Sequence, residues 1–223
     1  MFSIYKGREL VDKKRAEKFI RYFSKGDNWH HLNLKSGGLG YGWIHYSLIR
    51  LLKPDRVLCV GSKWGLIPAI CALACKDNKK GKVDFVDAGY DISKNQGPGK
   101  HWGGVGFWKK CNPVRYFGKF GLQNYINLYV MTSKEYFETH KRASYGYVHI
   151  DGDHSYKGVK FDFEMSLPKV KTGGFLAIHD IGSPDKDGNL YGTRKFWREI
   201  QKISKNNFLE INEDPGIGII QKA

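Results

Sequence analysis

The chain has 223 residues, a length that suits one well-buried domain and is short for two. It contains no continuous apolar run of about 18 residues, and its first residues lack the apolar stretch of a secretory signal, so we expect a soluble, cytoplasmic protein without a membrane span. The formal net charge of +15 attracts anions. Because the lysines are scattered, nucleic-acid binding stays an alternative that we do not favour.

Helices and strands are predicted to alternate along most of the chain. Helical spacing of apolar residues predicts a helix over 9–23, and a second helix should end before Pro54. Short apolar runs predict strands at 56–60, 82–86, 126–130, 147–150 and, after a Gly173-Gly174 turn, 175–178. Helices are expected at 66–74, 133–140, 156–167 and 194–203, and a hairpin at 208–211 and 217–220.

This alternation predicts an α/β fold with a mostly parallel, doubly wound sheet that helices cover on both faces. We expect a single domain over 1–223, in which 1–53 form a helical cap and 54–223 form the core. Residues 88–121 interrupt the pattern with several glycines, Trp102 and Trp108, and we interpret them as an insertion or lid beside the substrate.

A glycine-bearing turn follows the first predicted strand, in Gly61-Ser62-Lys63-Trp64-Gly65. Glycine lets a ligand approach the backbone, and the helix that follows presents unpaired amides at its N-terminus. The turn has neither the G-x-G-x-x-G spacing of a dinucleotide site nor the Gly-Lys-Ser/Thr ending of a P-loop. An ordinary strand-to-helix turn is the alternative interpretation.

Asp87 ends the second predicted strand. A carboxylate at that position can accept both hydroxyls of a ribose. Position alone equally allows a solvated aspartate, but the glycine turn before it favours ribose binding.

Acidic and imidazole side chains follow two further strands, as Asp151-Gly-Asp153-His154 and His179-Asp180. Such groups at adjacent strand ends could bind magnesium or manganese. His154 could take a proton from a substrate hydroxyl, because an imidazole titrates near neutral pH. The alternative is that Asp153 and His154 cap the next helix while His179 packs in the core.

These segments carry a family resemblance. The runs VLCVGSKWG, YVHIDGDHSYKGVKFD, GGFLAIHDI and GIGII, together with Asp87, resemble a class I S-adenosylmethionine-dependent methyltransferase. The chain is most similar to the branch of macrolide-sugar O-methyltransferases and cephalosporin-hydroxylase-like proteins, with catechol and caffeoyl-CoA O-methyltransferases as more distant relatives. The resemblance covers roughly Gly37 to the C-terminus.

The resemblance implies a seven-stranded sheet with an antiparallel last strand, and a role for each matching residue. On the donor side, the methionine end of the cofactor would contact Gly61, Ser62 and Gly65. The ribose would contact Asp87, and the adenine would lie near Thr132 and Ser133. On the acceptor side, a metal would be held by Asp151, His179 and Asp180, with His154 as general base. Two departures are Cys59 and His179, which both stand where the family has acidic residues.

The function implied is methyl transfer from S-adenosylmethionine to a small-molecule hydroxyl on a sugar, glycolipid or other natural-product-like acceptor. The basic charge favours an anionic acceptor. The alternatives are an RNA methyltransferase, a cofactor-binding protein with a decayed catalytic site and, with less support, a nicotinamide-dependent dehydrogenase. The sequence leaves open whether the chain forms a homo-oligomer.

Overall fold

The structure is a computed structural model that describes residues 12–90, 106–183, 192–203 and 205–223. Its described strands form one seven-stranded sheet in the order β3-β2-β1-β4-β5-β7-β6. They are β1 (Arg56–Gly61), β2 (Lys82–Asp87), β3 (Ile126–Val130), β4 (Tyr145–Asp151), β5 (Val170–His179), β6 (Asn207–Ile211) and β7 (Ile217–Gln221). Strands β1 to β5 are parallel, and β7 runs antiparallel to both β5 and β6. This confirms the predicted fold class.

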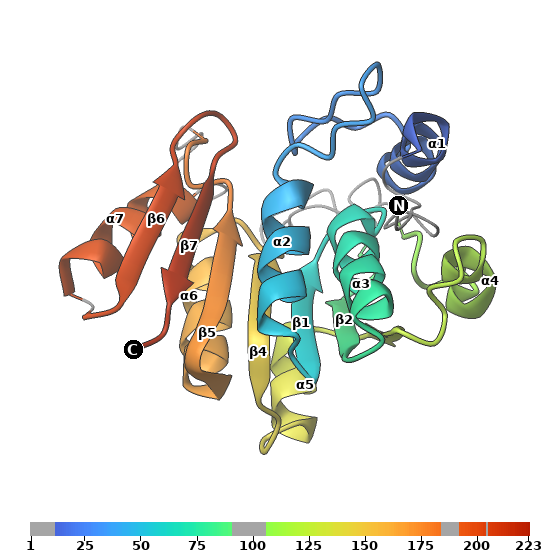
Figure 1. Cartoon of the computed structure of the whole chain (residues 1–223). Helices are drawn as coiled ribbons and strands as arrows, with labels where there is room; N and C mark the ends of the chain where they lie inside the picture. The colour runs from blue at the N-terminus through green and yellow to red at the C-terminus, as the bar shows by residue number, and fades with distance from the viewer. Residues whose placement is uncertain (1–11, 91–105, 184–191, 204) are drawn as a thin grey trace, which may run out of the picture.

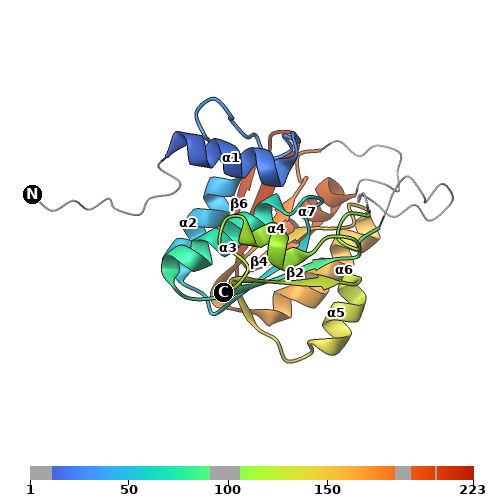
Figure 2. The same ribbon diagram turned by 90° about the vertical axis from the view of Figure 1, so that its right-hand side faces the viewer.

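Helices lie on both faces of the sheet. They are α1 (Lys13–Ser24), α2 (Gly42–Leu52), α3 (Leu66–Asn78), α4 (Pro113–Gly118), α5 (Ser133–Thr139), α6 (Tyr156–Ser166) and α7 (Thr193–Ile203), with a 3-10 turn η1 (Leu167–Lys169) after α6. Figures 1 and 2 show α2 and α3 on one face and α5, α6 and α7 on the other. None of the helices in the described ranges is long and apolar enough to cross a membrane.

Alternation along the central strands divides the core in two, because successive side chains point to opposite faces. In β1, Val57 and Cys59 pack with α2 and α3, whereas Leu58 and Val60 pack with the residues of α5, α6 and α7. All four side chains are buried. A strand buried on both faces reads as the continuous apolar run seen in the sequence.

The strand order reverses at β1, which pairs with β2 on one side and β4 on the other. In an open parallel sheet, ligands bind beyond the carboxyl ends of the strands at this switch point. Gly61, Asp87 and Asp151 are the last residues of β1, β2 and β4. The topology therefore brings these three positions to one edge of the sheet.

The predicted Gly173-Gly174 turn is wrong, because β5 runs through both glycines. The strand tolerates them through an irregularity: Tyr145 of β4 pairs with Val170, but Tyr147 pairs with Phe175. In addition, α4 was not predicted, and α3 continues four residues beyond the expected end at position 74. Trp102 and the rest of 91–105, within the predicted lid, lie outside the described residues.

Candidate active site

A cavity of about 910 Å³ opens beyond the carboxyl ends of the strands. Nine of the ten predicted site residues line it: Gly61, Ser62, Asp87, Thr132, Ser133, Asp151, His154, His179 and Asp180. The segment between α1 and α2 adds Asp27, Trp29 and His30 to the lining. The structure thus gathers residues from five strand ends and the N-terminal segment around one space.

The glycine turn holds β1 close to β4. A Cβ atom on Gly61, whose φ is +78°, would lie 2.0 Å from the carbonyl oxygen of Asp151, so no side chain fits there. Gly65 is the predicted residue that does not line the cavity. It begins α3 with a φ of +82°, and a Cβ atom there would lie 2.9 Å from the indole ring of Trp108. In this structure Gly65 therefore lies against Trp108, and its contact with the cofactor stays a prediction.

Asp87 faces the cavity from the end of β2. One of its carboxyl oxygens accepts a hydrogen bond of 2.7 Å from the backbone amide of Gly89. Burial raises the pKa of the Asp87 carboxyl to about 6, an effect to which the charge of Asp151 adds. A carboxyl group with one short backbone hydrogen bond retains lone pairs that can accept hydrogen bonds from a ligand.

Thr132 and Ser133 follow β3 and begin α5. The N-cap is Thr132: its hydroxyl accepts from the amide of Glu135 at 3.2 Å, and its own amide donates to the Glu135 carboxylate at 2.8 Å. This capping box engages the Thr132 hydroxyl. The Ser133 hydroxyl instead hydrogen-bonds to Asp162 of α6.

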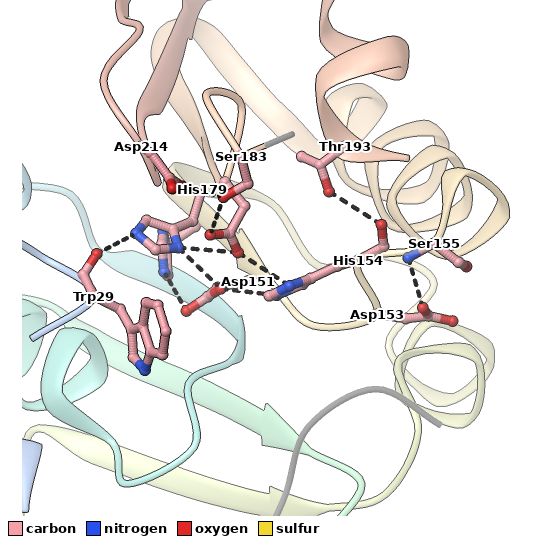
Figure 3. A network of polar contacts seen from close by, with 11 residues as sticks. Trp29, Asp151, Asp153, His154, Ser155, His179, Ser183, Thr193 and Asp214 are labelled. Carbon is pink, nitrogen blue, oxygen red and sulfur yellow. Dashed lines mark hydrogen bonds and ion pairs between the residues drawn. The ribbon is translucent and has the colours of Figure 1, made fainter. Parts of the chain in front are cut away.

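Two aspartates and two histidines converge at the other side of the cavity (Figure 3). His154 bridges the carboxylates, with Nε2 at 3.2 Å from Asp151 and Nδ1 at 3.1 Å from Asp180. The Nδ1 atom of His179 lies 3.4 Å from Asp151 and 3.3 Å from Asp180. Ser183 donates a hydrogen bond of 3.3 Å to Asp180.

The alternative in which His154 caps a helix is not what the structure shows. Ser155 is the N-cap of α6, and its hydroxyl accepts from the amide of Gly158 at 3.0 Å. Asp153 supports this turn by accepting from the amide of Ser155 at 2.9 Å. His179 is buried, but its ring contacts carboxylates and a carbonyl group.

The charges of neighbouring side chains shift the pKa of each histidine and aspartate in this cluster. Burial alone would lower the pKa of His154, but the carboxylates of Asp180 and Asp151 outweigh burial and raise it. The pKa of His179 is raised well above its ordinary value by the same two carboxylates, again against burial. Conversely, the neighbouring histidines lower the pKa of Asp151 and of Asp180, although burial opposes this. The two carboxylates therefore favour the protonated form of both imidazoles.

The donor atoms of the cluster suit a divalent cation. Asp151, His154 and Asp180 each offer one ligand atom, and these atoms lie within 4.8 Å of one another. The predicted set named His179 in place of His154, and the Nδ1 of His179 contacts the same two carboxylates. Carboxylate oxygens combined with imidazole nitrogen fit manganese and its neighbours better than magnesium, which prefers oxygen alone.

Three further histidines near the cluster were not predicted. The Nε2 atom of His149 lies 3.8 Å from Asp151, the ring of His30 lies 4.4 Å from that of His179, and His45 packs against His149 with ring centroids 4.7 Å apart. Burial lowers the pKa of His30 to about 3, so its imidazole is neutral. His149 lies two residues before Asp151 on β4, so the two side chains point to the same face of the sheet. This spacing could have predicted from the sequence that His149 lies near the cluster.

A comparison with protein families identifies the class of protein to which this fold and cavity belong. Residues 58–181, more than half of the chain, match the family model described as a methyltransferase domain, and the chain belongs to this family. No curated protein matches the chain.

Solved structures with the same fold have low sequence identity. An O-methyltransferase of tomaymycin synthesis from Streptomyces achromogenes, in complex with S-adenosylmethionine, is 16% identical with a TM-score of 0.64, over 99% of this chain and 92% of that one. A putative caffeoyl-CoA O-methyltransferase from Staphylococcus aureus is 15% identical with a TM-score of 0.65, over 93% and 92%. An O-methyltransferase from Bacillus cereus in complex with S-adenosylhomocysteine is 14% identical with a TM-score of 0.60, over 99% and 93%.

Proposed function

We propose that the protein transfers a methyl group from S-adenosylmethionine to a hydroxyl group of a small molecule, with the help of a divalent cation. The observation that carries this proposal is the shared cavity. Its donor side holds Gly61 and Asp87, and its acceptor side holds Asp151, His154 and Asp180. Methyl transfer requires a donor and a nucleophile in line within one site, and the presence of both sets of residues around one cavity supports this function.

The donor side accounts for a nucleoside bearing a sulfonium chain. The backbone at Gly61 and Ser62 can approach the methionine portion closely, because no side chain fits at Gly61. Asp87 would accept the ribose hydroxyls. Ser133 and its partner Asp162 lie beyond it, beside β3 and α6, where the base would lie.

On the acceptor side, His154 would take the proton from the attacking hydroxyl. The cation would be held by Asp151, His179 and Asp180. When bound, it would neutralise the carboxylates, thereby lowering the pKa of His154 and of the acceptor hydroxyl. His154 lines the cavity, and contacts of its two ring nitrogens with Asp151 and Asp180 fix the position of its ring.

The net charge of +15 favours an anionic acceptor, although six aspartates also line the cavity, at positions 27, 87, 151, 153, 162 and 180. Three lysines line the cavity, at positions 63, 134 and 157, and the Lys63 ammonium pairs with Asp27 at 2.8 Å. The family resemblance supports a sugar, glycolipid or natural-product hydroxyl as acceptor, and the structural neighbours include O-methyltransferases.

Isothermal titration calorimetry with S-adenosylmethionine, with and without Mn²⁺, tests the proposal. We expect saturable binding of the methyl donor and a change in its affinity or enthalpy with the cation. NADH, titrated by fluorescence, should not bind. Absence of donor binding under both conditions would overturn the proposal. Binding of transfer RNA that persists at high salt would favour the RNA methyltransferase alternative instead.

A further inference from the structure

One carboxyl group on the inner face of α6 lies in the cavity without a use in the chemistry described above. Asp162 is 2% exposed and lines the cavity together with Ser133 and Gly152. Its Oδ1 atom has no hydrogen-bond partner in the part of the chain that the structure describes. Buried polar atoms in folded proteins are nearly always paired, so this atom calls for a partner that a ligand would bring.

The surroundings of Asp162 suit a flat ring. Val60, Val86, Met131 and Phe161 line the same cavity and belong to the apolar cluster on the α6 face of the sheet. Gly152 leaves room beside the carboxyl group: a Cβ atom there would lie 3.1 Å from Oδ2 of Asp162 and 3.3 Å from Val60. Apolar walls with one hydrogen-bonding group at the edge are the usual features of a site for a small heteroaromatic ligand.

The order of residues across the sheet indicates which part of the donor this would be. Gly61 ends β1, Asp87 ends the neighbouring β2, and Ser133 follows β3, the outer strand. With the methionine chain at Gly61 and the ribose at Asp87, the base continues towards Ser133, whose hydroxyl hydrogen-bonds to Asp162. Asp162 then lies at the edge of the base.

We propose that Asp162 is a specificity-determining residue that recognises the 6-amino group of adenine, with Oδ1 accepting a hydrogen bond from that group. This inference rests on the proposed function, since it assumes that the cavity binds S-adenosylmethionine. A buried group that is paired only in the correct complex discriminates strongly, because a ligand lacking the partner leaves it unsatisfied.

The test compares two ligands by calorimetry: S-adenosylhomocysteine and its analogue in which hydrogen replaces the 6-amino group. The wild-type chain should prefer the amino compound by roughly tenfold to a hundredfold, the range for a hydrogen bond to a charged or buried partner. The Asp162→Ala variant should bind both compounds alike. The Asp162→Asn variant should retain the preference, because its amide oxygen can accept the same hydrogen bond.

Ser166→Ala is the matched control, since Ser166 lies one turn further along α6, is buried, and does not line the cavity. It should leave both affinities unchanged. If Asp162→Ala does not fold, Asp162→Ser replaces it, because serine is too short to reach the amino group. Equal binding of the two ligands by the wild type, or a preserved preference in Asp162→Ala, would overturn this inference. If the wild type bound neither ligand, the proposed function itself would fail.

Discussion

The Nε2 atom of His179 lies 3.1 Å from the backbone carbonyl oxygen of Trp29. A carbonyl group can only accept, so Nε2 carries the proton and donates it, which leaves Nδ1 to face the carboxylates of Asp151 and Asp180. Metal-binding histidines commonly have one ring nitrogen fixed in this way by a backbone carbonyl. The contact also ties the end of β5 to the segment between α1 and α2.

This arrangement predicts which cation the protein prefers. Calorimetric titration should show Mn²⁺ binding at least about tenfold more tightly than Mg²⁺, because imidazole nitrogen suits transition metals and magnesium prefers oxygen ligands. His179→Asp should reduce or reverse this preference. Trp29→Ala is the control, since it removes an exposed side chain and keeps the carbonyl that contacts His179. Equal affinities of the wild type for the two cations would contradict the prediction.

His154→Ala tests the assignment of the base. Methyl transfer should fall by roughly a hundredfold to ten-thousandfold, the usual contribution of a positioned general base. The affinity for S-adenosylmethionine should stay within about threefold, since His154 lies on the acceptor side. A transfer assay with labelled donor measures the first effect, and calorimetry measures the second. The control is His31→Ala, at an exposed histidine outside the cavity lining. Full turnover in His154→Ala would show that another group takes the proton.

Gly65→Ala separates a packing role from a cofactor role. The added methyl group would press against Trp108 at a backbone conformation that alanine adopts poorly, so the free energy of unfolding should fall by about 2–4 kcal/mol. The folded fraction should bind S-adenosylmethionine normally. Gly173→Ala is the control, because its φ is similar at +74° but no atom lies within 4 Å of the new Cβ, and its cost should be about 1 kcal/mol. Urea denaturation measures both. Loss of cofactor binding without loss of stability would favour the cofactor role.

Most of the sheet could be predicted because its central strands are buried on both faces. A continuous apolar run such as 57–60 then indicates a strand directly. The local pattern fails where contacts between distant parts of the chain determine the structure. The six residues of α4 are too few to show a helical period, although Asn112 caps the helix and Pro113 opens it. Gly173 and Gly174 were expected to form a turn before the strand, but their backbone hydrogen bonds to Lys222 hold them in β5.

The sequence could predict those parts of the site that lie at the ends of adjacent strands. Asp151 and Asp180 end or follow adjacent strands, so parallel pairing brings them together. Trp29 and His30 reach the cluster from a segment more than a hundred residues earlier, and no local pattern announces such a contact. The sequence pattern of α6 could have singled out Asp162. This residue occupies a core-facing position of α6 with Val159, Phe163 and Ser166, where a carboxyl group is unexpected.

The buried carboxyl group of Asp162 also predicts how stability depends on pH. Burial raises its pKa from 3.8 to about 7 in the folded chain, against the hydrogen bond from Ser133. The folded state therefore holds this proton more tightly, and the stability that the proton contributes is full below about pH 4 and is lost as pH rises to about 7. Asparagine does not ionise, so the free energy of unfolding of Asp162→Asn relative to the wild type should rise by about 3 kcal/mol between about pH 5 and pH 8. Urea unfolding at both pH values measures the difference, and Ser166→Ala should show none. A gap between wild type and Asp162→Asn that is independent of pH would mean that the carboxyl group does not titrate in this range, and that water or a neighbouring group satisfies it in solution.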